Sequence, residues 1–316
     1  MSDKPAHLLW SLCVWGERYT DYFLNLHLPS LMQEGNLPAL REIAPLKARI
    51  YTDRPTLERI APALKQIAHH FDGIEAEMLP PDTYPHPTFL MSRAQWRVAE
   101  IAVRENAALV FSYPDLIVAA DSYRHVVDKV KAGARAAFWT GICMREENAA
   151  AFNAEGSAWS EVPARDLLAA ATNGLHPLTA QRFWPGRIGW PSIMHMTGDG
   201  GALTTKTFHP NPVYVFPRNA PHNWQDSLDG TYVSKSGLTW DECARLTDPG
   251  FFWAEVAADT KRERQGTDRA WDDAALKAWA IQYGIPAWNQ REWEFVYRMD
   301  HNQDADPLGI AGWPSR

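Results

Sequence analysis

The chain has 316 residues, of which 46% are hydrophobic, so it can bury a core of ordinary size. Its formal net charge is -7 and it contains no long block of Lys or Arg, which argues against DNA or RNA as a partner. We find no apolar leader at the N-terminus and no run of about 18 apolar residues. We therefore expect a cytoplasmic protein without a membrane span.

Two residue counts limit the chemistry further. The three cysteines, Cys13, Cys143 and Cys243, are an odd number at wide spacing, which suits neither a disulfide framework nor a zinc cluster. We expect them to be reduced and mostly buried. The 15 tryptophans are either core and interface residues or platforms that stack sugars and bases, and both interpretations stay open.

The first half of the chain alternates between strand-like and helix-like segments. Residues 8–15 are apolar, as in a strand covered on both faces, and Gly16 separates them from a helical pattern over residues 17–31. Residues 48–52 predict a second strand, and Pro55 or Thr56 opens the helix that follows it.

The same alternation continues to residue 112. Residues 74–78 predict a short strand, residues 88–106 a long helix, and residues 107–112 a further buried strand. Such an order is typical of βαβ units. We therefore predict an α/β fold: an open, mostly parallel sheet flanked by helices, followed by a mixed, aromatic-rich C-terminal part.

Asp115 lies just beyond the end of the strand predicted over residues 107–112, and Pro114 before it interrupts regular strand pairing. Open α/β sheets bind their ligands at the carboxyl ends of the strands, so Asp115 is a candidate site residue. A turn or helix-cap role is the alternative. Asp121 is better explained as the N-cap of a helix over residues 123–132, and Arg145 follows a last apolar strand that ends at residue 142.

A change in composition near residue 150 predicts a boundary between a first half at residues 1–150 and a second half at residues 151–316. In the second half, His176 follows a helix stop and is most simply a structural histidine, and His209 precedes a strand-like run. Two interpretations of Asp229 stay open. It begins an Asp-Gly hairpin turn, or it lies with Asp226 and His209 at the ligand-binding edge of the sheet of the first half. The C-terminal tryptophans clamp the tail onto the first half or line an acceptor groove.

Four segments of the first half form a recognisable set: residues 14–19 (Val-Trp-Gly-Glu-Arg-Tyr), 28–31 (Leu-Pro-Ser-Leu), 51–53 (Tyr-Thr-Asp) and 111–115 (Phe-Ser-Tyr-Pro-Asp). With the order of strands and helices around them, they resemble bacterial glycosyltransferase-like proteins with the A-type, nucleotide-sugar-binding fold. The resemblance covers roughly residues 7–145. The last segment stands where that family has its Asp-x-Asp motif, but Tyr113 replaces the first aspartate. His176-Pro177 and His209-Pro210 resemble histidine-proline elements of the same proteins.

The resemblance implies that residues 1–150 are the nucleotide-binding half and residues 151–316 the acceptor-side half, and it implies a role for each matching position. The nucleotide would lie against Trp15, Gly16, Glu17, Tyr51, Thr52, Asp53 and Tyr113. Asp115 would bind a divalent cation, Mn²⁺ or Mg²⁺, that bridges the diphosphate. Asp115, His209 and Asp229 would form the catalytic set, with an imidazole or carboxylate taking the acceptor proton in inverting transfer.

We therefore predict a glycosyltransferase that uses a nucleotide-sugar donor and an acceptor of unknown identity. A non-catalytic nucleotide- or sugar-binding module on the same fold is the alternative. The sequence argues against three other enzyme classes. It has no Gly-x-Ser-x-Gly elbow of serine hydrolases, no His-Glu-x-x-His motif of zinc enzymes and no glycine fingerprint of dehydrogenases after the first strand.

Overall fold

The computed structural model describes residues 4–79, 87–154, 161–180, 187–188, 192–196, 202–207, 210–220, 235–258, 267–270, 274–275, 278 and 293–298. Its strands are β1 (Leu8–Cys13), β2 (Leu46–Thr52), β3 (Gly73–Met78), β4 (Ala108–Ser112), β5 (Leu116–Val118), β6 (Ala136–Trp139), β7 (Ile142–Arg145), β8 (Arg187–Ile188), β9 (Ser192–Met196), β10 (Ala202–Thr207), β11 (Asn211–Val215), β12 (Cys243–Arg245), β13 (Trp253–Ala257), β14 (Thr267–Ala270) and β15 (Trp293–Arg298). Its helices are α1 (Glu17–Tyr22), α2 (Leu28–Leu31), α3 (Arg54–Ile67), α4 (Pro87–Arg104), α5 (Ser122–Lys131), α6 (Glu146–Ala154), α7 (Ala164–Asn173) and α8 (Pro177–Ala180). A π-helix, η1 (Phe23–His27), joins α1 to α2, and 3₁₀ turns form η2 (Leu37–Glu42), η3 (Ala68–His70) and η6 (Trp240–Glu242).

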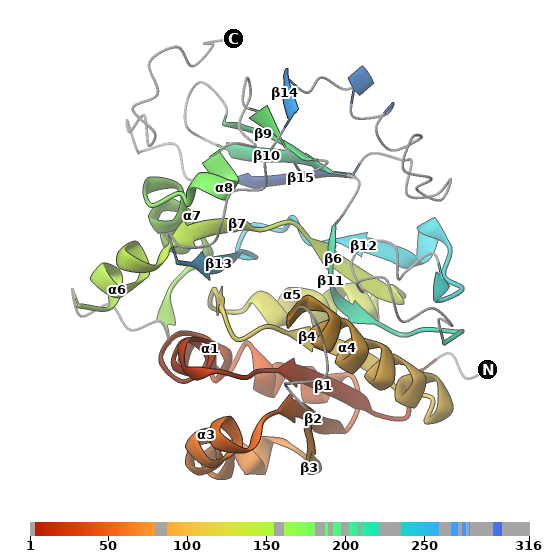
Figure 1. Ribbon diagram of the computed structural model, residues 1–316. Helices are drawn as coiled ribbons and strands as arrows, with labels where there is room; N and C mark the ends of the chain where they lie inside the picture. Colours follow the sequence, from red (N-terminus) through yellow and green to blue (C-terminus); the bar gives the residue numbers. More distant parts are fainter. Residues whose placement is uncertain are drawn as a thin grey trace.

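The central sheet has seven strands in the order β12-β6-β11-β4-β1-β2-β3 (Figure 1). Strands β4, β1, β2 and β3 are parallel neighbours, and β11 alone runs antiparallel, between β4 and β6. β1 and β4 are almost wholly buried, as their apolar runs predict. The predicted open, mostly parallel sheet is confirmed.

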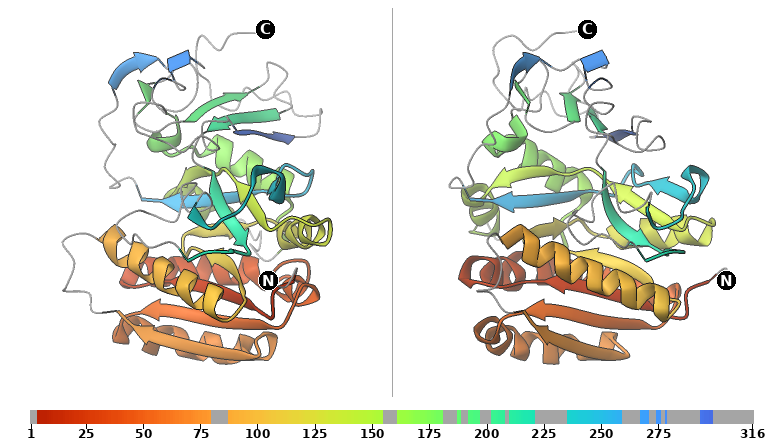
Figure 2. Two further views of the ribbon diagram at one scale, coloured as in Figure 1. Left: turned by 90° about the vertical axis from the view of Figure 1, so that its right-hand side faces the viewer. Right: turned by 45° about the vertical axis from the view of Figure 1, so that its right-hand side comes forward.

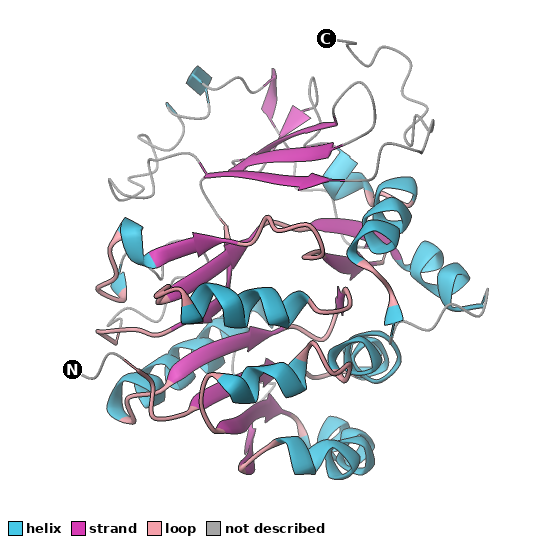
Figure 3. Ribbon diagram, turned by 180° about the vertical axis from the view of Figure 1, so that it is seen from behind, coloured by secondary structure: helices cyan, strands magenta, loops and turns pink. Residues whose placement is uncertain are grey.

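Helices cover both faces of this sheet. α4 packs on β1 and β4 from one face, and α3 and α5 lie on the other (Figures 2 and 3). α3 buries Ile60, Leu64 and Ile67, whose helical spacing forms one stripe. The ring of Phe71, just after η3, lies 5.6 Å from that of Trp10 on β1, so this end of the helical layer is anchored on the central strand.

The apolar stretch before residue 143 forms two strands in different sheets, whereas one strand was predicted. β6 ends at Trp139 in the central sheet, and β7 begins at Ile142 in a three-stranded sheet of order β5-β13-β7. The chain turns at Gly141, where an added Cβ would stand 1.9 Å from the Trp139 ring, so only glycine fits that approach. The Tyr297 hydroxyl donates to the Thr140 carbonyl at 2.9 Å and fixes the turn from β15.

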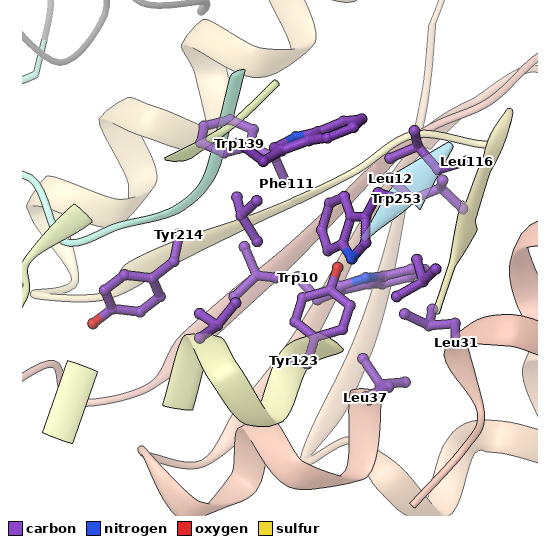
Figure 4. Close-up of a cluster of buried hydrophobic side chains, with 14 of the residues drawn as sticks. Trp10, Leu12, Leu31, Leu37, Phe111, Leu116, Tyr123, Trp139, Tyr214 and Trp253 are labelled. Atoms are coloured by element: carbon purple, nitrogen blue, oxygen red, sulfur yellow. The ribbon is translucent and has the colours of Figure 1, made fainter. Parts of the chain in front are cut away.

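An aromatic cluster joins the two sheets. Trp253 on β13 is fully buried, and its ring lies 5.1 Å from that of Tyr123 on α5 and 5.3 Å from that of Trp139 on β6 (Figure 4). Phe251 packs beside it at 5.7 Å. Trp253 therefore packs the later chain onto the first half of the chain, as the interpretation of the tryptophans as core and interface residues predicts.

Strands from both sides of residue 150 share the central sheet. The expected boundary falls within α6, and β11 and β12 from the later chain complete the sheet that β1 begins. All three cysteines are free, and Cys143 is buried while Cys13 and Cys243 are partly buried. No helix in the described part of the chain is long and apolar enough to cross a membrane.

Candidate active site

The carboxyl ends of three neighbouring strands meet at one edge of the central sheet. Cys13 on β1 is paired with Tyr51 on β2, and Leu12 is paired with Ser112 on β4. Because these strands are parallel, residues 15–16, 51–53 and 113–115 follow the strands on the same side. In Figure 1 this is the side toward which the β1 arrow points and where α1 and α6 lie. The prediction that these strand ends share one edge is confirmed.

The end of β1 turns sharply into α1 at Gly16. Gly16 is the N-cap of the helix, and its backbone has φ 77 and ψ 156. Residues other than glycine rarely adopt this conformation. Glu17 is exposed in the first helical turn, where its charge is favourable beside the free backbone N–H groups. Trp15 is half-buried and packs against the core, so part of its indole faces this edge.

The end of β2 offers less surface than the sequence predicted. Tyr51 and Thr52 are both 0% exposed, so neither side chain faces a ligand in this structure. Burial raises the pKa of the Tyr51 phenol to about 12, with Arg49 lowering it and Glu77 raising it. Asp53 is half-buried, and its Oδ1 accepts a hydrogen bond from the Thr56 N–H at 2.8 Å, which caps α3.

The end of β4 carries Asp115 in a tight turn. The Leu116 N–H donates to the Tyr113 carbonyl at 3.3 Å and closes a turn over residues 113–116, which we call the Asp115 turn. The Asp115 carbonyl accepts from the Val256 N–H of β13 at 2.7 Å, so the second sheet also holds the backbone of this turn. Both Tyr113 and Asp115 are partly exposed.

A second carboxylate joins Asp115 at this edge. Tyr22, on α1, is 5% exposed, and its buried hydroxyl lies beside the Glu146 carboxylate. Burial raises the pKa of Tyr22 above its usual range. The charge of Glu146 and its hydrogen bonding with the phenol raise this pKa further, Arg18 lowers it, and the charge of Asp115 adds a smaller increase. One hydroxyl therefore lies within electrostatic reach of both carboxylates and of a guanidinium.

This cluster, Tyr22, Asp115, Glu146 and Arg18, is drawn from three elements. Tyr22 and Arg18 come from α1, Asp115 follows β4, and Glu146 is the first residue of α6 after β7. Two carboxylates beside a buried phenol supply hard oxygen ligands and one hydrogen-bond donor. Such a group can bind a cation together with a polyanion, or hold a substrate hydroxyl.

Sequence reasoning missed Tyr22 and Glu146. Glu146 directly follows an apolar strand, which is the same signal that marked Asp115, but the single strand predicted before it ended at residue 142. Asp121, the nearest carboxylate in sequence, is exposed at the N-cap of α5 and makes no side-chain cap bond. Nothing in the sequence pattern distinguishes Tyr22 from the exposed Tyr19 nearby, because only the packing of α1 decides which ring turns inward.

Three of the predicted residues, His209, Asp226 and Asp229, lie outside the described residues. His176 is 1% exposed and its Nε2 lies 3.1 Å from the Ala258 carbonyl, as expected of a structural histidine. Arg145 donates to the Leu175 carbonyl at 3.2 Å and pairs with Glu147 at 3.5 Å.

The described residues do not form a complete metal-binding group, since no three His, Cys, Asp or Glu side chains among them gather closely enough to hold an ion. Asp115 and Glu146 carry the oxygen ligands that a divalent cation prefers, and an ion held by this pair would take its remaining ligands from substrate and water.

The fold and this cluster define an α/β protein with an acidic site at the carboxyl edge of a largely parallel sheet. No protein-family model matches the chain, and no curated protein matches it. Among solved structures, it is similar to a candidate glucose-1-phosphate thymidylyltransferase from Bacillus anthracis, crystallised in complex with a sucrose, at 10% identity and a TM-score of 0.28. The match covers 45% of this chain and 56% of that protein, so this chain spans little more than half of its length.

Proposed function

We propose that the protein is a glycosyltransferase that moves a sugar from a nucleoside-diphosphate-sugar donor to an acceptor hydroxyl. The observation that supports it best is the cluster of Asp115, Glu146 and Tyr22 at the carboxyl edge of the sheet. In an open α/β sheet that edge is where a nucleotide lies.

A divalent cation suits this cluster. A diphosphate and two carboxylates repel one another, so they can share the edge only if a cation lies between them. Asp115 and Glu146 would hold it, and phosphate oxygens and water would complete its coordination. When bound, Mn²⁺ or Mg²⁺ would offset the negative charge that develops on the leaving diphosphate.

The nucleoside would extend along the ends of β1 and β2. Trp15 and Tyr19 supply partly exposed aromatic surface there, and the side chain of Tyr19 is 41% exposed. Asp53 keeps one carboxylate oxygen beyond its cap bond for a ribose or base. His209 and Asp229 stay candidates for acceptor activation. A binding module without turnover is the competing function, because the segment before Asp115 has Tyr113 where a second aspartate would strengthen the cation site.

The test combines binding and turnover. Calorimetric titration with UDP, GDP, CDP and TDP, with and without Mn²⁺, identifies the nucleotide, and release of that diphosphate from its sugar conjugate reports turnover. We expect Asp115→Asn to lower turnover by about 100-fold or more with little change in melting temperature. Asp121→Asn is the matched control, since this exposed carboxylate lies outside the cluster. Tight binding without any release of diphosphate would favour the binding module, and absence of binding by every nucleotide would refute both the glycosyltransferase and a nucleotide-binding module.

A further inference from the structure

The buried side chain of His27 contacts the chain on both sides of Asp115. His27 is 0% exposed, and it lies at the end of the π-helix η1, which packs on β5. Its Nδ1 lies 2.9 Å from the Leu116 carbonyl oxygen and its Nε2 lies 2.5 Å from the Ser112 Oγ. Ser112 and Leu116 are the residues at the two ends of the chain segment that carries Asp115.

The hydrogen bonds determine the tautomer of this imidazole. A carbonyl oxygen only accepts, so Nδ1 bears the proton and donates it to Leu116. Nε2 of the neutral ring is then the acceptor for the Ser112 hydroxyl. Burial lowers the pKa of His27 to about 4, so the ring is neutral near pH 7 and keeps this arrangement.

Neighbouring polar residues of the same segment bind other parts of the chain. The Ser30 Oγ accepts from the Val118 N–H at 3.1 Å, and the Asn36 side chain donates to the Ala119 carbonyl at 3.1 Å. Val118 is the last residue of β5 and Ala119 follows it, so both contacts lie beyond the Asp115 turn. Among these three side chains His27 alone contacts both the residue before the Asp115 turn, Ser112, and its last residue, Leu116, which requires its ring to project from η1 between β4 and β5. π-Helical turns of this kind redirect single side chains and often occur at functional sites.

We propose that His27 is a positioning residue that holds the Asp115 turn, and with it the Asp115 side chain, in place at the sheet edge. His27 is wholly buried and touches no substrate; it acts through the backbone of Leu116 and the hydroxyl of Ser112. The inference rests on the proposed function for the role of Asp115, and on geometry alone for the hold on the turn.

The experiment compares three variants of the full chain. His27→Leu removes both hydrogen bonds and keeps much of the volume, whereas His27→Gln retains one donor and one acceptor at similar reach. Ser30→Ala is the matched control, because it also removes two buried hydrogen bonds, one with the Val118 N–H and one to the His27 carbonyl, but leaves the contacts of the His27 ring in place. If His27→Leu does not fold, Ser112→Ala takes the place of that variant in the comparison, because it removes only the hydrogen bond to the His27 Nε2.

Amide hydrogen exchange of Tyr113, Asp115 and Leu116, the turn residues that carry a backbone N–H, is the readout that a merely structural role would not move selectively. We expect exchange in the turn to rise by about 10-fold or more in His27→Leu, to remain near wild type in Ser30→Ala, and to recover in His27→Gln. Turnover should fall by about 10- to 100-fold in His27→Leu, while the metal-free dissociation constant of the nucleoside diphosphate changes little.

The two proposals fail in different ways. Equal exchange of the turn in His27→Leu and Ser30→Ala would overturn the role of His27, even if the enzyme is active. Faster exchange in His27→Leu with unchanged turnover would overturn it as well, because the turn would then not need this support. If wild type binds no nucleoside diphosphate, the proposed function fails, and the exchange data alone decide whether His27 holds the turn.

Discussion

At the scale of single residues, two aspartates at the same sheet edge have different surroundings. Asp53 caps α3 through the Thr56 N–H, so part of its carboxylate already has a structural task. Asp115 lies in a tight turn, near the buried hydroxyl that Glu146 also influences. The same strand-end position therefore yields a helix cap in one strand and a member of an acidic cluster in another.

Substitution of Asp53 separates its cap from its predicted nucleotide contact. Asp53→Ala should lower the free energy of unfolding by about 1 kcal/mol through loss of the cap. Asp53→Ser keeps a cap oxygen but loses the carboxylate, so we expect near wild-type stability and weaker nucleoside diphosphate binding without metal. Calorimetric titration and urea denaturation of both variants measure the two effects. Wild-type affinity in Asp53→Ser would show that the predicted contact is wrong.

The buried His27 predicts how stability depends on pH. Its pKa falls from 6.5 to about 4 on folding, so the unfolded chain binds the proton more readily. This contribution to stability is therefore complete above pH 6.5 and is lost as the pH falls toward 4. The loss amounts to about 3 kcal/mol.

Urea denaturation of wild type and His27→Gln from about pH 7 to about pH 4 isolates this contribution, because other groups titrate alike in both. The difference between the two proteins should change over this range in favour of the variant at low pH. A constant difference would contradict the assignment.

At the scale of elements, the turn from β1 into α1 depends on Gly16. An added Cβ would meet nothing within 4 Å, so a substitution there is opposed by the backbone conformation alone. The helical segment that follows was predicted over residues 17–31, and it has these limits, but the π-helix inside it was not foreseen. Apolar periodicity locates a helix, whereas a single extra residue in one turn leaves the pattern almost unchanged.

Gly16→Ala should lower the free energy of unfolding by about 1–3 kcal/mol, because alanine is strained at positive φ. Gly73→Ala is the control: it also has open space around an added Cβ, but its φ is not positive. Chemical denaturation of the two variants gives the comparison. Equal stability of both would mean that the turn relaxes to another conformation at little cost.

At the scale of the whole molecule, Trp253 connects chain segments far apart in sequence. Its ring contacts Tyr123 and Trp139 from the first half of the chain, and β11 and β12 complete the sheet begun by β1 (Figure 4). The halves predicted from composition therefore share one core, although their functional division stays a prediction.

Trp253→Ala should lower the free energy of unfolding by about 3–5 kcal/mol, the usual cost of emptying a buried aromatic site. Phe89→Ala, at a side chain that is 39% exposed, should change it little. Far-UV circular dichroism during urea denaturation should show one transition in wild type, and two separate transitions would contradict a shared core.

The sequence by itself determined the βαβ order of the first half, its strand ends and Asp115 at their edge. Apolar runs, helical spacing and turn residues are local signals, and parallel strands must bring their carboxyl ends to one side. Only the tertiary structure decided that β11 enters the sheet antiparallel, that Tyr51 is buried, and that Tyr22 and Glu146 join Asp115. These outcomes depend on which distant segments pack together, and the free energy of such contacts leaves no periodic trace in the chain.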